Sequence, residues 1–318
     1  MARRVLINAE MPEYLLGALE TQYPQFTFTV VNRNSPELWD YLSDTEILIS
    51  FQCDKEMVDN TQNLRWIQLL RVGLDGVPLT EIFKRGIILT NAHGIHKNMM
   101  AEYAIAAMIN LSRNWHLVFK NQLKARWDRS VPQGEINGAI VGILGLGSIG
   151  KEIAKRAKFF GMKVLGTKSN PQPVADVDEV YGSEQMAEVF KQSDYIINLL
   201  PLTTETRGLI GQKYFKLMKP TASFINIGRG ATVNEADLIK ALKEKQFYTA
   251  VLDVFEEEPL PSDHPLWKLE NVILTPHFSG SSSKYLDKVF PIITHNLGKY
   301  LAEKPGEMIN PVKSDRGY

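Results

Sequence analysis

Cysteine is almost absent from this sequence: among 318 residues there is one, Cys53, so no disulfide can form within the chain. That composition favours a reducing compartment, and we expect Cys53 to be a small buried side chain rather than a nucleophile. Net charge is absent too, because 36 acidic residues balance 36 basic ones. A neutral chain gives no support for a nucleic-acid or anionic-membrane partner.

Long apolar runs are also lacking: no segment approaches the ~20 residues that a membrane-spanning helix needs. Hydrophobic residues make up 44% of the chain and charged residues 23%, which is typical of a globular protein. We therefore expect a cytoplasmic protein with no membrane partner and no metal site. The length allows two domains of ordinary size.

One glycine-rich stretch dominates what is present, the segment 139–150 with the sequence AIVGILGLGSIG. Its first half is apolar and branched, as a buried parallel strand should be. Its second half fits G-x-G-x-x-G through Gly145, Gly147 and Gly150, and a helix-like run follows. Strand, glycine turn and helix in this order predict a dinucleotide site, with the phosphates facing the free N–H groups at the helix start. The alternative is a plain tight turn between a strand and a helix.

Apolar segments alternate with helical ones on both sides of this stretch, which predicts doubly wound parallel sheets. The segments expected as strands are Val5–Asn8, Phe26–Val31, Ile47–Phe51, Leu64–Leu70 and Ile87–Leu89, and then Ile140–Leu144, Lys163–Thr167, Tyr195–Leu200, Ser223–Gly228, Thr249–Phe255 and Val272–Thr275.

Three further segments carry structural expectations. Met99–Arg113 is apolar on most sides and predicts a buried helix. The stretch 115–137 holds Trp115 and Trp127 beside basic residues, and is either a surface excursion or an arm that packs against a second subunit. Asn234 can cap the helix that follows it. The last helix, about 283–303, should break at Pro291.

The choice between the two nicotinamide dinucleotides depends on the end of the second strand after the glycines. NAD sites usually place Asp or Glu about 20 residues on, to bind the ribose hydroxyls. Here the sequence is Gly-Thr-Lys-Ser-Asn, with Lys168 and Ser169 and no carboxylate. A lysine suits a 2′-phosphate, so NADP(H) is favoured and NAD(H) remains possible. The alternative reading is an exposed loop lysine in a NAD site.

Candidate catalytic side chains follow three later strands. Arg229 lies between two glycines, where its guanidinium could bind a carboxylate through two hydrogen bonds. Asp253 ends an apolar strand, where a carboxylate needs a partner. His277 also follows a strand, and histidine is the usual proton donor in carbonyl reduction. His93 and His96 follow another strand and could line a site.

In order and spacing, five segments resemble those of the D-isomer-specific 2-hydroxyacid dehydrogenase family: GLGSIG, NLLPLTTETRGLI, FINIGRGATVNEADLIKAL, VLDVFEEEPLPSDHPLW and NVILTPHFSG. In the first lobe, RVGLDGV resembles the family's substrate-carboxylate loop. The segment ILTNAHGIHKNMMAEYAIAAM resembles the family's crossover into the cofactor domain. The resemblance implies a Rossmann-type cofactor domain, residues 98–283, inserted into a flavodoxin-like substrate domain, residues 1–97 and 284–318. It also implies a homodimer built on the 115–137 arm.

The resemblance implies roles for individual residues. Arg229 would bind the substrate, His277 would be the general acid and base, and Glu258 would be the histidine's partner. The backbone N–H groups of Val72 and Gly73 would hold the substrate carboxylate. The cofactor would be bound by Gly145, Gly147, Ser148, Ile149, Gly150, Lys168, Ser169, Pro201, Thr206, Ile227, Gly228, Asp253 and Gly280, with Asp253 at the nicotinamide amide. Lys168 departs from the Asp that many members have.

The expected reaction is reduction of a 2-oxo acid to a D-2-hydroxy acid by hydride transfer from NAD(P)H, and the reverse. Two alternatives stay open. One is a dehydrogenase for a phosphorylated substrate such as 3-phosphoglycerate. The other is a non-catalytic, nucleotide-sensing protein of the corepressor kind, against which the Arg–Glu–His set argues.

Overall fold

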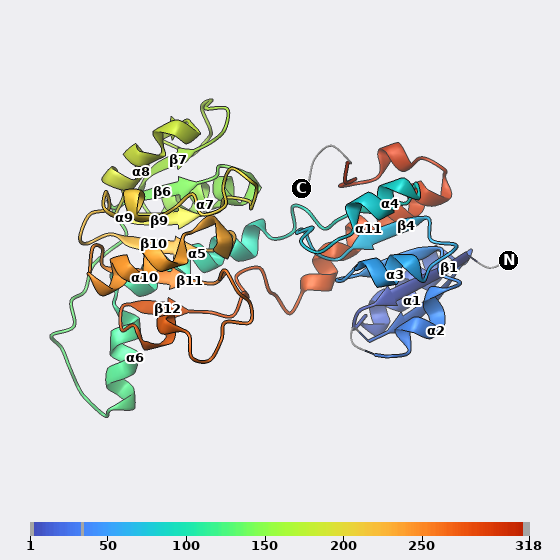
Figure 1. Ribbon diagram of the computed structural model, residues 1–318, viewed down its shortest axis with the longest axis horizontal. Coiled ribbons are helices and arrows are strands. Elements are labelled where there is room, and N and C mark those ends of the chain that lie inside the picture. Colours follow the sequence, from blue (N-terminus) through green and yellow to red (C-terminus); the bar gives the residue numbers. More distant parts are fainter. Residues whose placement is uncertain (1–2, 33–34, 314–318) are drawn as a thin grey trace. The chain divides into compact units, whose positions relative to one another are not determined.

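The computed structural model describes residues 3–32 and 35–313. Residues 1–2, 33–34 and 314–318, which the sequence assigns to the substrate domain, lie outside the described residues. The chain divides into two compact units, which Figure 1 colours along the sequence. The first comprises the described residues of Met1–Ile95 and Ser282–Tyr318, and the second comprises His96–Ser281.

The first unit is built on a parallel sheet, in which the described strands follow the order β2-β1-β3-β4-β5. This is the order of flavodoxin-like sheets. Neighbouring strands are in parallel register, for example Val5 beside Ile47. The strands are β1 (Arg3–Asn8), β2 (Phe26–Val31), β3 (Ile47–Ser50), β4 (Trp66–Leu69) and β5 (Ile88–Thr90).

Helices cover both faces of this sheet, as the burial of alternate strand residues in two different clusters shows. Val5 and Ile7 pack in the cluster that contains residues of α1 and α11, whereas Leu6 packs with residues of α2, α3 and α4. The helices are α1 (Glu13–Gln22), α2 (Leu38–Leu42), α3 (Lys55–Asp59), α4 (Leu79–Lys84) and α11 (Tyr285–Leu301), with a 3₁₀ turn η4 (Pro305–Glu307).

The expected break at Pro291 is wrong, because α11 continues through that residue. A proline inside a helix removes one hydrogen bond and crowds the preceding turn. Here the helix buries Val289, Ile292, Ile293 and Leu297, and burying each such side chain stabilises by about 1.5–3 kcal/mol. This burial offsets the local cost of about 3 kcal/mol.

The second unit has a larger parallel sheet, whose described strands follow the order β12-β11-β10-β9-β6-β7-β8. The order reverses between β6 and β9, as in dinucleotide-binding sheets, which bind ligands at such switch points. The strands are β6 (Ile140–Leu144), β7 (Lys163–Thr167), β8 (Glu179–Tyr181), β9 (Tyr195–Asn198), β10 (Ser223–Asn226), β11 (Thr249–Leu252) and β12 (Val272–Leu274). The expectation of doubly wound parallel sheets in both halves is confirmed.

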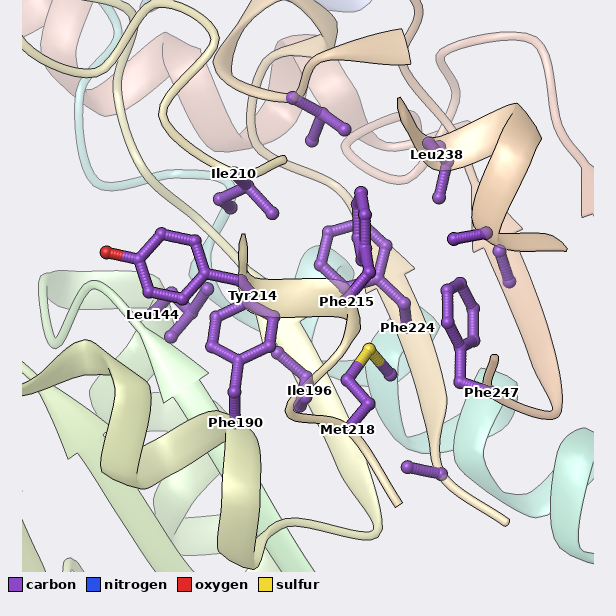
Figure 2. Close-up of a cluster of buried hydrophobic side chains, with 14 of the residues drawn as sticks. Leu144, Phe190, Ile196, Ile210, Tyr214, Phe215, Met218, Phe224, Leu238 and Phe247 are labelled. Carbon is purple, nitrogen blue, oxygen red and sulfur yellow. The ribbon is translucent and has the colours of Figure 1, made fainter. Parts of the chain in front are cut away.

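The faces of this sheet are packed by different helices. Leu144, Ile196 and Phe224 are buried with residues of α8, α9 and α10, in the cluster of Figure 2, where Phe190, Tyr214 and Phe215 surround them. On the other face, Ile143, Ile197 and Ile225 from the same three strands are buried with residues of α5 and α7. The helices are α5 (Lys97–Ser112), α6 (Trp115–Leu123), α7 (Ser148–Phe159), α8 (Met186–Gln192), α9 (Gln212–Phe215) and α10 (Glu235–Lys243), with 3₁₀ turns η1 (Ser183–Gln185), η2 (Gly230–Thr232) and η3 (Pro265–Lys268).

Two local expectations, the cap at Asn234 and the burial of Cys53, are confirmed. The Asn234 side chain accepts a hydrogen bond from the N–H of Asp237 at 3.0 Å and so caps α10. Cys53 is 3% exposed, and burial raises the pKa of its thiol to about 12, so it is not an activated nucleophile. In the described part of the chain, no helix has both the length and the apolar character to cross a membrane.

Candidate active site

The glycine turn joins β6 to α7 in the second unit. Gly145 has a φ of 106°, a left-handed conformation that glycine adopts without steric cost. The Leu146 N–H donates to the Thr167 carbonyl at 3.0 Å, so the turn is tied to the end of β7. The first N–H groups of α7, from Ser148 onward, have no partners within the helix and carry the positive end of its dipole.

The space around two glycines fits a bound dinucleotide. A Cβ added at Gly150 would lie 2.3 Å from the Gly145 carbonyl oxygen, so only glycine lets α7 pack this closely on the turn. A Cβ added at Gly147 would meet nothing within 4 Å, which leaves open space in front of the turn. A pyrophosphate site needs a strand, a left-handed turn, a tightly packed helix and open space in front of the turn, and this segment has all four.

Lys168 directly follows β7, beside the residue that binds the glycine turn. Its backbone N–H donates to the Tyr181 carbonyl at 3.0 Å. Its side chain is partly exposed, and Ser169 after it is exposed. A cation and a hydroxyl at this position suit a phosphate group. The edge strand β8, which the sequence did not indicate, fixes this segment through Tyr181.

The loop after β9 reaches the same edge of the sheet. The Leu199 N–H donates to the Leu144 carbonyl at 3.0 Å, beside the glycine turn. Farther along, the Thr206 hydroxyl donates to the Pro201 carbonyl at 2.6 Å and closes the loop on itself. Thr206 and Pro201 therefore lie in one ordered loop at the edge where the phosphates are expected.

The segment after β10 carries Arg229. Ile227 and Gly228 are buried, and a Cβ added at Gly228 would lie 3.0 Å from the Leu200 carbonyl oxygen. The Arg229 guanidinium donates to the Gly228 carbonyl at 2.9 Å. At Gly230 an added Cβ would lie 1.9 Å from the backbone of Phe255. This close packing brings the arginine loop against the loop that leads to Glu258.

Asp253, just after β11, is fully buried, and its carboxylate accepts three hydrogen bonds. The Thr275 hydroxyl donates to Oδ1 at 2.6 Å. The N–H groups of Phe278 and Ser279 donate to Oδ1 and Oδ2 at 3.0 and 2.9 Å. All three donors flank His277 along the chain. Asp253 therefore holds the histidine turn, a role that the sequence did not reveal.

His277 stands on this turn in a strained conformation. Its φ is 51°, the left-handed region, which costs a non-glycine residue of order 1 kcal/mol or more and persists only where surrounding contacts impose it. Its backbone N–H donates to the Asp253 carbonyl at 2.9 Å. Its Nδ1 lies 2.6 Å from Glu258 Oε2, and its side chain is 51% exposed.

The pKa shifts of His277 and Glu258 are consistent with each other. The hydrogen bond to Glu258, together with the charges of Glu258 and Asp253, raises the pKa of His277 against the opposing effects of burial and of the positive charge of Arg229. Burial acts to raise the pKa of Glu258, but the hydrogen bonds from His277 and the Phe255 N–H and the charges of His277 and Arg229 give a net lowering. The pair therefore favours an imidazolium bound to a carboxylate.

The remaining predicted residues fall in both units. His96 and Gly280 lie together in the second unit, because a Cβ added at Gly280 would lie 2.7 Å from the His96 ring. His93 belongs to the first unit, where its carbonyl accepts from Asn310 at 2.8 Å. Val72 and Gly73 follow β4 in the first unit, and the Val72 carbonyl accepts from Asn91 at 3.1 Å.

Comparison with known proteins defines the class. Residues 105–279 match the model of the family described as D-isomer specific 2-hydroxyacid dehydrogenase, NAD binding domain. Glyoxylate reductase of Pyrococcus furiosus is 33% identical over 97% of this chain and 94% of its own length. The chain belongs to the D-isomer specific 2-hydroxyacid dehydrogenase family, as the sequence motifs indicated. It is an NAD(P)-dependent oxidoreductase acting on 2-oxo and 2-hydroxy acids.

Two solved structures are similar over nearly the whole chain. A D-isomer specific 2-hydroxyacid dehydrogenase family protein from Aeromonas salmonicida is 32% identical, with a TM-score of 0.87 over 98% of this chain and 99% of that one. An NADPH-dependent glyoxylate/hydroxypyruvate reductase from Sinorhizobium meliloti, solved with NADP and sulfate, is 25% identical, with a TM-score of 0.83 over 99% of this chain and 100% of that one.

Proposed function

We propose that this protein reduces a small 2-oxo acid of the glyoxylate and hydroxypyruvate class, with NADPH as the preferred reductant, and that Arg229, Glu258 and His277 perform the reaction. The observation that carries the proposal is the 2.6 Å contact between His277 Nδ1 and Glu258 Oε2, within electrostatic range of Arg229. The relatives named for glyoxylate reduction support the substrate class.

The cofactor would be held by the glycine turn and by the loops after β7, β9 and β10. The N–H groups of Ser148 and Ile149 would face the pyrophosphate, and Lys168 with Ser169 would face a 2′-phosphate. Pro201, Thr206, Ile227 and Gly228 would line the groove, and Asp253 and Gly280 would lie toward the nicotinamide end. When bound, this group supplies the hydride.

The protein's part in the chemistry follows from charge. The Arg229 guanidinium binds the substrate carboxylate through two hydrogen bonds and orients the 2-oxo group. As the carbonyl is reduced, negative charge grows on its oxygen, and Arg229 and protonated His277 stabilise it. His277 donates its proton from Nε2, because Nδ1 is held by Glu258. That the N–H groups of Val72 and Gly73 also hold the substrate carboxylate stays a prediction.

The proposed preference for NADPH rests on Lys168 and on the similarity to a reductase that is described as NADPH-dependent. A charge-assisted hydrogen bond to a phosphate contributes about 1.5–3 kcal/mol. We therefore expect kcat/KM for NADPH to exceed that for NADH by about tenfold or more.

A panel assay tests the proposal. Absorbance at 340 nm is followed with NADPH and with NADH, each with glyoxylate, hydroxypyruvate, pyruvate and a phosphorylated 2-oxo acid. The proposal expects the highest kcat/KM for an unphosphorylated small acid with NADPH. Preference for the phosphorylated acid indicates the phosphoglycerate-type alternative. Tight cofactor binding without turnover of any acid indicates a nucleotide sensor, and equal or better efficiency with NADH contradicts the cofactor assignment.

A homodimer is the second part of the proposal. Helix α6 buries none of its residues in the protomer. Phe119, Leu123 and Trp127 are 54%, 89% and 92% exposed on and just after it, and aromatic residues are enriched in protein interfaces. Light scattering after size-exclusion chromatography should give twice the 36.0 kDa chain mass, and Leu123→Asp should give monomers. A wild-type monomer would contradict this part. The cytoplasmic location stays a prediction.

A further inference from the structure

Tyr103, on helix α5, contacts the histidine turn on both sides of His277. Its hydroxyl lies 2.6 Å from the hydroxyl of Thr275, two residues before the histidine. The edge-to-face contact of its ring with Phe278, one residue after the histidine, has a centroid distance of 6.1 Å and an interplanar angle of 79°. Such pairs contribute beyond the area that they bury. No part of the reaction described above uses this tyrosine.

The direction of the hydrogen bonds in this cluster is fixed by chemistry. The Asp253 carboxylate only accepts, so the single proton of the Thr275 hydroxyl lies in the 2.6 Å bond to Oδ1. Thr275 therefore accepts from Tyr103, and the protons of both hydroxyls point toward Asp253. Burial raises the pKa of Tyr103 to about 12, so the phenol keeps its proton throughout the neutral range. Hydrogen bonds that are linked in this way strengthen one another.

The far end of the turn also rests on the start of α5. His96 precedes the helix, and an added Cβ at Gly280 would lie 2.7 Å from its ring. The left-handed φ of 51° at His277 is thus imposed by Asp253 on one side and by α5 on the other. Loss of one tether should let the backbone relax and move Nδ1 away from Glu258.

We propose that Tyr103 is a positioning residue for His277: through the chain of hydrogen bonds from Tyr103 to Thr275 to Asp253, helix α5 holds the imidazole against Glu258. This inference rests on the proposed function of His277. The charged groups that act on the imidazole are Glu258, Asp253 and Arg229. Tyr103 adds no charge at neutral pH and acts on geometry alone.

The test compares Tyr103→Phe, which removes only the hydroxyl, with Thr275→Val and Thr275→Ser. Tyr300→Phe is the matched control, because it removes a phenol that donates to Glu46 at 2.7 Å in the other unit. Tyr103→Phe should lower kcat about fivefold, the effect of one neutral hydrogen bond, with KM for the 2-oxo acid and for NADPH within about twofold. Thr275→Ser keeps the hydroxyl and should retain most of kcat. The double variant Tyr103→Phe/Thr275→Val should have a kcat only slightly lower than that of Thr275→Val alone.

A second measurement does not depend on turnover. NMR titration of the His277 ring should give a pKa about half a unit lower in Tyr103→Phe than in the wild type, and unchanged in Tyr300→Phe. Wild-type kcat and His277 pKa both retained in Tyr103→Phe would overturn the inference. A wild type that reduces no 2-oxo acid would instead overturn the proposed function, and the titration would still decide whether Tyr103 sets the state of His277.

Discussion

The imidazole Nδ1 of His277 lies 2.6 Å from Glu258 Oε2, and the other carboxylate oxygen, Oε1, accepts the N–H of Phe255 at 3.0 Å. The backbone thus fixes the glutamate, and the glutamate fixes the histidine. With Nδ1 held in this way, Nε2 is the nitrogen that can give up a proton to substrate. This contact therefore acts on both the orientation and the protonation of the candidate acid.

Glu258→Gln should move the pH profile of reduction to lower pH. Glu258 raises the pKa of His277 above its ordinary value of about 6.5. Reduction needs the protonated imidazole, so activity is high below this pKa and falls as the pH rises through it. Without the carboxylate the pKa drops and the falling limb shifts down. Glu257→Gln, an exposed neighbour in the same turn, is the control, and an unmoved limb in Glu258→Gln would argue against the pairing.

His277→Ala should lower kcat by about 10²-fold or more, the scale of general acid catalysis. Binding of NADPH should change little, because the cofactor is expected to rest on the glycine turn and its neighbouring loops. Steady-state rates and a fluorescence titration of NADPH measure the two effects. His295→Ala, in the first unit, is the control. Turnover near the wild-type level in His277→Ala would remove the histidine from the mechanism.

Arg229→Ala should raise KM for the 2-oxo acid and lower kcat together. The guanidinium binds the substrate carboxylate in the ground state and the growing oxyanion charge in the transition state, so both parameters suffer. The loss in kcat/KM should be about 10²-fold or more. Arg229→Lys keeps the charge without the planar fork and should recover only part of it. Unchanged kinetics in Arg229→Ala would exclude it as the anchor.

Gly147→Ala should weaken cofactor binding without destabilising the fold. The φ of Gly147 is −80°, which alanine adopts freely, and the new methyl would point into open space. That space is where the pyrophosphate is expected, so Kd for NADPH should rise about tenfold or more. Gly17→Ala, which also meets nothing within 4 Å, is the control. An unchanged Kd with an unchanged Tm would mean that the pyrophosphate binds elsewhere.

Much of the fold could be predicted from the sequence because short apolar runs and glycine turns are local signals. The strand Ile140–Leu144 and the cap at Asn234 are examples, and both appear in the structure. Strand β8 was missed because Glu-Val-Tyr at a sheet edge has no apolar periodicity. The break at Pro291 was wrong because burial of the helix face decides the outcome, and burial depends on residues far away in the chain.

In the candidate site too, residues with a local sequence signal could be predicted, and residues that depend on contacts between distant segments could not. Arg229, Asp253 and His277 could be singled out because each follows a strand, and parallel strands end at one edge of the sheet. The family resemblance, and no local signal, distinguished Glu258 from Glu256 and Glu257. Thr275 and Tyr103 could not be found, because their contact joins positions 172 residues apart. Only the packing of α5 on the histidine turn reveals it.

The most direct test of D-specific 2-oxo acid reduction is to identify the enantiomer formed when the wild-type protein reduces pyruvate with NADPH, by chiral chromatography alongside the loss of absorbance at 340 nm. We predict stoichiometric oxidation of NADPH and D-lactate as the product, because the family is D-isomer specific and Arg229 and His277 would hold the substrate carboxylate and carbonyl oxygen in one orientation. Formation of L-lactate, or oxidation of NADPH without a hydroxy acid, would contradict it.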